Sequence, residues 1–389
     1  MTRALSAVRD CGARCIGTIT IDSYTRCGDY VSPWVCLASG EDLNGYPIMS
    51  HPVANTRKML SETVRPDFPI QVRHGTPRPQ ALFKRLLDLG LNATEGGPVS
   101  YCMPYGRVSL REASAAWWDG CRMLATECDD AHLESFGGCL LGQLCPPSLL
   151  VAMTVLEGLF FRSAGLRSVS LSYAQGSSVI QDLAALAVLR RHATRMLQGI
   201  DWHVVLYTYM GVFPATEAGA ALLLHDSVDI ARVSGCERMI VKTRAERRQI
   251  PTIEENLLAI TAADLICESQ NILDPVDLIE LAELELEIDT EVVALLDSVL
   301  NLAGEPAVAI IEAFHRGLLD IPYCLHSDNR QLTRAGINSR GLLYWVETGN
   351  LNITCAKRND RPANMTADSL LRQLQYVSDS YDLRAGARD

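Results

Sequence analysis

The chain has 389 residues, a formal net charge of −11 and a hydrophobic content of 48%. It is long enough to bury a large core and too acidic for general attraction to nucleic acid. Its most apolar stretch, residues 149–161, contains Glu157 and is too short to cross a bilayer. The 13 cysteines include no Cys-x-x-Cys pair, and we interpret them as reduced thiols of a cytoplasmic protein.

Seven apolar runs end in a polar or charged residue followed by glycine, proline or helix-like sequence. In chain order they cover residues 19–26, 70–77, 92–97, 133–138, 169–176, 204–211 and 239–243. The intervals leave room for one helix between successive strands, which is the rhythm of an α/β protein with a TIM-type parallel β/α barrel. Seven parallel strands would leave an open edge in such a barrel, so one strand is expected to be missing.

Helical spacing of apolar residues predicts an outer ring of helices over residues 82–91, 110–125, 147–162 and 178–197. We therefore assign residues 1–250 to the barrel and residues 251–389 to a helical and irregular C-terminal region. The acidic segment 278–289 predicts a long helix packed on the barrel, with its carboxylates on a solvated face. The polar tail from residue 358 is expected to be partly mobile.

Four charged groups, Arg26, Arg73, Glu95 and Lys242, end predicted strands, and parallel strands bring such ends to one mouth. Two guanidinium groups suit two carboxylates, and a carboxylate suits an ammonium group. The pattern therefore predicts a small amino dicarboxylic acid as ligand. Structural salt bridges inside the barrel are the alternative, and Lys242 with Glu246 also fits an ordinary surface ion pair.

Two Asp-x-His sequences, Asp130 to His132 and Asp201 to His203, begin like the cobalt-ligating Asp-x-His-x-x-Gly signature. Ser135 and Leu206 stand where the signature needs glycine, so we interpret both as chance matches. His74, directly after Arg73, is the histidine best placed for a function.

Seven ordered blocks stand out along the chain: TIDSYTR at 20–26, RHGTP at 73–77, EGGPVSY at 95–101 with Pro104 and Tyr105, IQD at 180–182, MGVFP at 210–214, IVKT at 240–243 and DIP at 320–322. With these blocks the chain resembles the large (epsilon) subunit of methylaspartate mutase, the adenosylcobalamin-dependent glutamate mutase, over about residues 4–355. The resemblance implies a radical rearrangement of L-glutamate to L-threo-3-methylaspartate.

The resemblance also implies roles for single residues. It makes Arg26, Arg73 and Glu95 catalytic and substrate-binding residues, with Tyr101 and Tyr105 lining the substrate pocket. It assigns the cofactor contacts to Thr20, His74, Met210, Lys242 and Glu246, with His74 near the corrin face. No metal ligand is expected in this chain, because the cobalt of adenosylcobalamin is ligated by a separate small subunit. The implied assembly is a homodimer of this chain within a heterotetramer.

The sequence departs from this family at its beginning, where a helical region and a first strand with a further clamp arginine are expected. Ser50 stands where asparagine is common. A start placed too late, a strand supplied by another polypeptide and a divergent paralogue all remain open. The alternatives to a mutase are a non-catalytic barrel that binds an amino dicarboxylate or the small subunit, and a cofactor-free lyase. A role in amino-acid catabolism or antibiotic biosynthesis would fit the mutase.

Overall fold

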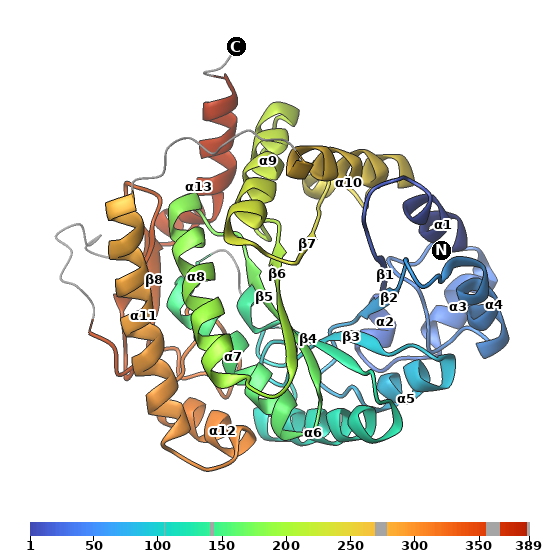
Figure 1. Cartoon of the computed structure of the whole chain (residues 1–389), viewed down its shortest axis with the longest axis horizontal. Coiled ribbons are helices and arrows are strands. Elements are labelled where there is room, and N and C mark those ends of the chain that lie inside the picture. The colour runs from blue at the N-terminus through green and yellow to red at the C-terminus, as the bar shows by residue number, and fades with distance from the viewer. Residues whose placement is uncertain (105, 141–143, 269–277, 355–365, 387–389) are drawn as a thin grey trace.

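The computed structural model describes residues 1–104, 106–140, 144–268, 278–354 and 366–386 (Figure 1). Its strands are β1 (Gly17–Thr20), β2 (Ile70–Arg73), β3 (Ala93–Gly96), β4 (His132–Ser135), β5 (Ser168–Ala174), β6 (Asp201–Tyr207), β7 (Arg238–Ile240), β8 (Arg334–Ile337) and β9 (Leu343–Glu347). The first seven were expected from the sequence, and all seven are confirmed.

Helices separate and cover these strands. They are α1 (Thr2–Arg9), α2 (Ser23–Arg26), α3 (Ser32–Ser39), α4 (Val53–Thr63), α5 (Gln80–Leu89), α6 (Leu110–Glu127), η1 (Gly137–Cys139), α7 (Pro147–Ser163), α8 (Val179–Met196), α9 (Glu217–Ser234), η2 (Arg244–Arg247), α10 (Ile253–Glu268), α11 (Leu278–Leu300), α12 (Pro306–Arg316) and α13 (Ala367–Gly386). The four predicted outer helices correspond to α5, α6, α7 and α8. None of the described helices has the length and apolar character of a membrane span.

The sheet runs β1 to β7 in chain order, and every neighbouring pair is parallel. It curls into a half-barrel with helices around its outside (Figure 1). In the described part of the chain β1 and β7 do not pair, so the expected barrel rhythm is confirmed and the sheet does not close. The parallel register brings Thr20 beside Arg73 and Glu95 beside Glu134 at the strand ends.

The interval between β7 and β1 is partly bridged by other elements. Helix α10 contacts both α9 and α1, so the outer ring of helices continues past the gap (Figure 1). On the free edge of β1, the backbone amide of Tyr46 donates to the carbonyl of Thr20 at 2.8 Å, and Tyr46 pairs with Ile21. This contact protects part of an edge that would otherwise be unpaired.

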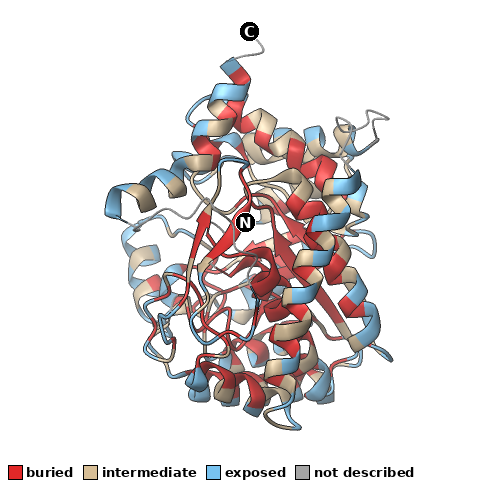
Figure 2. Ribbon diagram, turned by 90° about the vertical axis from the view of Figure 1, so that its left-hand side faces the viewer, coloured by how far each residue is buried: buried red, intermediate tan, exposed pale blue. Residues whose placement is uncertain are grey.

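The hydrophobic core lies between the sheet and its helices, where Figure 2 shows buried residues concentrated. Helix α7 is buried on nearly all sides because the sheet, α6, α8, α11 and α12 surround it. Helix α6 is capped at its N-terminus by Ser109, whose side chain accepts a hydrogen bond from the amide of Glu112 at 3.2 Å. Local capping and burial therefore agree on where this helix begins.

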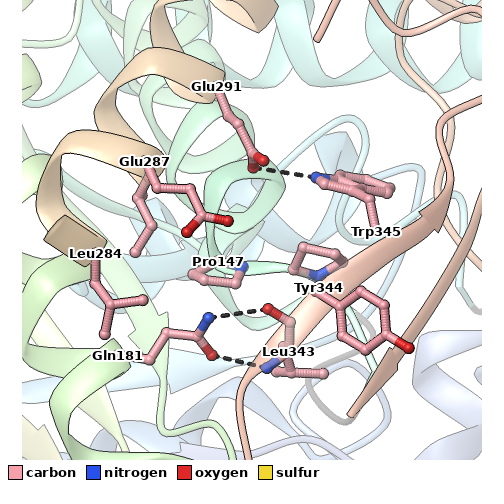
Figure 3. Close-up of a pocket in the computed structure, with 10 residues that line it drawn as sticks. Pro147, Gln181, Leu284, Glu287, Glu291, Leu343, Tyr344 and Trp345 are labelled. Atoms are coloured by element: carbon pink, nitrogen blue, oxygen red, sulfur yellow. Dashed lines mark hydrogen bonds between the residues drawn. The ribbon is translucent and has the colours of Figure 1, made fainter. Parts of the chain in front are cut away.

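The C-terminal region packs on the barrel through α11 and β9. Gln181 on α8 bonds both the amide and the carbonyl of Leu343 at 2.9 Å, and Trp345 donates to Glu291 on α11 at 3.2 Å (Figure 3). The pocket between them measures about 20 Å³, room for roughly one water. The predicted long acidic helix is confirmed. The carboxylates of residues 278–289 are not all merely solvated, because Glu285 and Asp289 bond to Arg191 and His192 of α8.

The expectation of a mobile tail is wrong for its last part. Helix α13 packs on α9, where Tyr381 and Arg384 donate to Asp226 at 2.8 and 3.0 Å. Val377, Tyr381 and Ala385 recur every four residues and form the buried stripe of a largely polar helix. Residues 358–365 and 387–389, to which that expectation also applies, lie outside the described residues.

Replacing Leu295 by alanine is expected to lower the free energy of unfolding by about 2–5 kcal/mol. Leu295 lies on α11 and is fully buried against the barrel, so truncation leaves a cavity. Leu286 on the same helix is 70% exposed, and Leu286→Ala should change stability by less than about 0.5 kcal/mol. Denaturant titrations of both variants measure the difference. A loss in Leu295→Ala as small as that in Leu286→Ala would show that the packing of Leu295 against the barrel does not stabilise the fold.

Candidate active site

Arg73 and Glu95 meet at the carboxyl ends of the adjacent strands β2 and β3. The Nε of Arg73 donates to both carboxylate oxygens of Glu95, at 2.9 and 3.0 Å, and its guanidinium lies 5.2 Å from the ring centre of Tyr207. Glu95 is buried, while 23% of the Arg73 side chain is exposed. Burial lowers the pKa of Arg73, but Glu95, Tyr207 and Tyr101 together outweigh it and hold that pKa well above its usual value.

Tyr101, in the loop after β3, makes a further hydrogen bond to Glu95, since its hydroxyl donates to Oε1. The loop is tied down by Glu157 of α7, which accepts hydrogen bonds from the amides of Val99 and Ser100 and from the hydroxyls of Ser100 and Ser135. Burial raises the pKa of Glu157 to about 7. A core carboxylate therefore fixes the position of a tyrosine at the mouth.

Arg26 lies on α2, directly after β1. Its side chain is half-buried, its Nη2 donates to the carbonyl of Ile21 at 3.3 Å, and its Nε is buried without a hydrogen-bond partner. A Cβ on Gly75 would lie 3.4 Å from its Cδ, so Arg26 packs beside the residues that follow Arg73. The structure thus joins Arg73, Glu95 and Tyr101 directly and sets Arg26 next to them.

His74 is buried among aromatic rings. It stacks on Trp117 with ring centres 5.6 Å apart and meets Tyr101 and Phe83 edge-on. Burial first, and then the charge of Arg26, lower the pKa of His74 to about 3. Its imidazole is therefore neutral at physiological pH. The expected contact with a corrin ring stays a prediction.

Acidification is expected to weaken the fold through His74. Its pKa is lowered on folding, so its stabilising contribution is complete above about pH 6.5, the value for an unfolded histidine, and is lost as the pH falls toward 3. Over that range each pH unit costs about 1.4 kcal/mol. Urea titrations at pH 7 and pH 5 should show a smaller loss for His74→Gln than for the wild-type chain. Equal losses would contradict the assignment.

The other predicted cofactor residues lie at the mouth but make no direct bond to Glu95. Lys242, after β7, pairs with Glu246 at 2.5 Å and lies 5.5 Å from the ring centre of Phe213, which confirms the expected i,i+4 contact. Thr20 ends β1 beside Arg73, and Met210 packs against the core after β6. Tyr105 lies outside the described residues. Ser50 is buried, and its hydroxyl donates to the carbonyl of Tyr30 at 2.8 Å.

The interior of the half-barrel holds a polar network that the sequence reading missed. Glu134 of β4 accepts hydrogen bonds from Arg238 of β7 at 2.6 Å and from Ser170 of β5 at 3.2 Å, and it also contacts the Tyr207 hydroxyl. The sequence does carry a signal for this network. Polar residues recur at every second position in β2, β4 and β5, and residues with that spacing lie on one face of a sheet.

His132 and His203 belong to this interior. Their rings stack with centres 5.1 Å apart, and His132 bonds the hydroxyls of Ser168 and Ser170 at 2.8 and 3.0 Å. His203 accepts a hydrogen bond from Arg238 at 2.8 Å. Both histidines have structural partners inside the sheet, which favours the interpretation of the Asp-x-His sequences as chance matches.

Comparison with known proteins places this chain in a family. The family described as methylaspartate mutase E chain (MutE) matches residues 1–369. The glutamate mutase epsilon subunits of Desulfitobacterium hafniense (strain Y51) and Escherichia coli O157:H7 are each 33% identical, over 85% of this chain and 71% of the relative. That of Haloarcula marismortui is 31% identical over 82% of this chain and 67% of the relative.

Among solved structures, a D-psicose 3-epimerase covers 57% of this chain at 12% identity. Its TM-score of 0.32 is too low to bear on the fold. The family match spans almost the whole chain and includes every strand of the half-barrel. The chain belongs to the methylaspartate mutase E chain family and is an isomerase of the mutase type.

Proposed function

We propose that this chain is the catalytic subunit of a glutamate mutase that rearranges L-glutamate to L-threo-3-methylaspartate with adenosylcobalamin. The observation that carries the proposal is the direct pairing of Arg73 with Glu95 at adjacent strand ends, with Arg26 beside them. Two cations and one carboxylate match a ligand that carries two carboxylates and one ammonium group.

The chain's own residues bind and orient this substrate. Arg26 and Arg73 hold its carboxylates, and Glu95 accepts hydrogen bonds from its ammonium group, while Tyr101 keeps the Glu95 carboxylate in place. The unpartnered Nε of Arg26 is a donor available to such a ligand. Each charge-assisted hydrogen bond is worth about 1.5–3 kcal/mol. Fixing both ends of a small substrate places its carbon skeleton for rearrangement.

The residues at the mouth also fit an adenosyl group. Lys242, which is half-buried, pairs with the exposed Glu246, and the pair offers both a donor and an acceptor to ribose hydroxyls. Thr20 ends β1, and Met210 lies just after β6. When bound, the cofactor supplies organic radical chemistry. The buried walls around Glu95 exclude water from the reacting groups.

The assembly is part of the proposal. The epsilon-subunit names of the relatives support a multi-subunit enzyme. We propose a small cobalamin-binding subunit as partner, a homodimer of this chain within a heterotetramer, and a cytoplasmic location. Copurification of the two subunits and the mass of the complex test the assembly.

The proposal is tested by anaerobic proton NMR of L-glutamate with this chain, the small subunit and adenosylcobalamin. The expected result is a new methyl doublet from 3-methylaspartate that requires all three components. A properly folded chain that binds the small subunit and gives no doublet would overturn the assigned reaction.

The unclosed sheet favours a second candidate, a non-catalytic member that binds an amino dicarboxylate or the small subunit. β1 and β7 remain unpaired in the described residues, so the barrel wall is incomplete there. Calorimetry separates the candidates, because a binding protein takes up glutamate or the partner subunit without adenosylcobalamin-dependent turnover.

A further inference from the structure

Tyr207 at the end of β6 stands between two buried carboxylates. Its hydroxyl lies 2.7 Å from Oε2 of Glu95 and also contacts Oε1 of Glu134. The side chains of Tyr207 and Glu134 are fully buried, and Glu95 is 1% exposed. The phenol thus joins the mouth of the half-barrel to its polar interior.

The single proton of the Tyr207 hydroxyl limits the hydrogen bonds that it can donate to the two carboxylates. A phenol carries one proton, and an ionised carboxylate can only accept hydrogen bonds. Tyr207 can therefore donate to one carboxylate at a time unless the other carboxyl group is protonated. A hydrogen bond donated to a carboxylate favours its ionised form, so the choice affects how readily Glu95 takes up a proton.

Arg238 holds Glu134 in place on the side away from Tyr207. It donates to Oε2 of Glu134 at 2.6 Å and is itself held by Gln71 at 2.7 Å and His203 at 2.8 Å. Burial raises the pKa of Glu134, but Arg238, Tyr207, His132 and Arg73 together outweigh it, so that pKa lies below its ordinary value. Glu134 therefore competes with Glu95 as an anion for the phenol proton.

We propose that Tyr207 and Glu134 are positioning residues for Glu95, with Glu134, anchored by Arg238, competing for the Tyr207 proton and thereby setting how readily Glu95 becomes ionised. The inference rests on the proposed role of Glu95 and assigns no substrate contact to either residue. The titratable and charged groups that face the two carboxylates are Arg73, Tyr101, His132, Cys139, Tyr207 and Arg238.

Two variants should shift the acid limb of the kcat/KM profile in opposite directions. Tyr207→Phe removes a donor from the Glu95 anion, so the acid limb of the kcat/KM profile should move about one pH unit upward. Glu134→Gln removes the competing anion and frees the Tyr207 proton for Glu95, so the limb should move downward. A purely structural role would give a lower kcat or lower stability with the limb in place.

A readout without turnover keeps this test separate from the proposed function. The carboxyl carbon signal of Glu95, in the chain labelled with ¹³C-glutamate and assigned by its loss in Glu95→Gln, should titrate with the same opposite shifts. Unchanged midpoints, or shifts in one direction, would overturn the inference. An inactive wild-type enzyme would overturn only the proposed function, because the NMR titration would still decide. If Glu134→Gln fails to fold, the upward shift in Tyr207→Phe carries the test.

Discussion

Glu95→Gln is expected to lower turnover of L-glutamate by at least about 100-fold, because breaking a buried, hydrogen-bonded charge pair costs about 2–5 kcal/mol. The wild-type carboxylate accepts hydrogen bonds from Arg73, Tyr101 and Tyr207 on its two oxygens. An amide offers one oxygen and places N–H donors where some of these donors point. The variant also leaves the charge of Arg73 without its partner.

Arg73→Lys should give a loss of similar size, because lysine cannot reproduce the Nε contact to both oxygens of Glu95. Rates are measured with the NMR assay, and circular dichroism checks the fold. Lys84→Met is the matched control. Lys84 pairs with Asp88 on the exposed outer face of α5, so this variant should retain wild-type turnover. Full activity in both Glu95→Gln and Arg73→Lys would remove these residues from the reaction.

The sequence was sufficient for the positions of these groups because strand ends are locally encoded. An apolar run that stops at Arg73 or Glu95 and is followed by glycine marks the end of a parallel strand. Parallel pairing then brings the two ends together without further information. The same logic predicted the seven strands, and the open edge followed from their number.

Contacts that depend on three-dimensional register could not be predicted in the same way. Glu134 lies in the predicted run 133–138, but its contact with Arg238, which lies on β7 and far away in sequence, depends on how the strands are placed in the sheet. Tyr207 lies inside an apolar run, and only its position opposite Glu95 gives its hydroxyl a role. Helix α13 was missed because its buried stripe is narrow within a polar sequence.

Glu157→Ala is expected to destabilise the chain by at least about 4 kcal/mol, a large part of the 5–15 kcal/mol that holds a typical domain folded. The substitution leaves two buried amides, of Val99 and Ser100, and two hydroxyls without their acceptor. Each unsatisfied buried group costs about 1–3 kcal/mol, and the cavity adds to the loss. Denaturant titration at pH 7 measures it.

Glu157→Gln is the matched control, because its carbonyl oxygen can accept from both amides while its NH₂ donates to the two hydroxyls. The pKa of Glu157 is raised to about 7 by burial. Its contribution is therefore complete below about pH 4.5, the unfolded value, and is lost as the pH rises through 7. Relative to Glu157→Gln, the wild-type chain should lose about 3 kcal/mol between pH 4.5 and pH 7.

If the free energy of unfolding changed equally with pH in the wild-type chain and in Glu157→Gln, the raised pKa of Glu157 would be contradicted. A loss below about 1 kcal/mol in Glu157→Ala would contradict its role in holding the loop after β3. Because that loop carries Tyr101, which donates to Glu95, Glu157→Ala should also lower turnover at temperatures where the chain remains folded. A buried carboxylate on the outer helix α7 would then control both the stability of the fold and the geometry of the mouth.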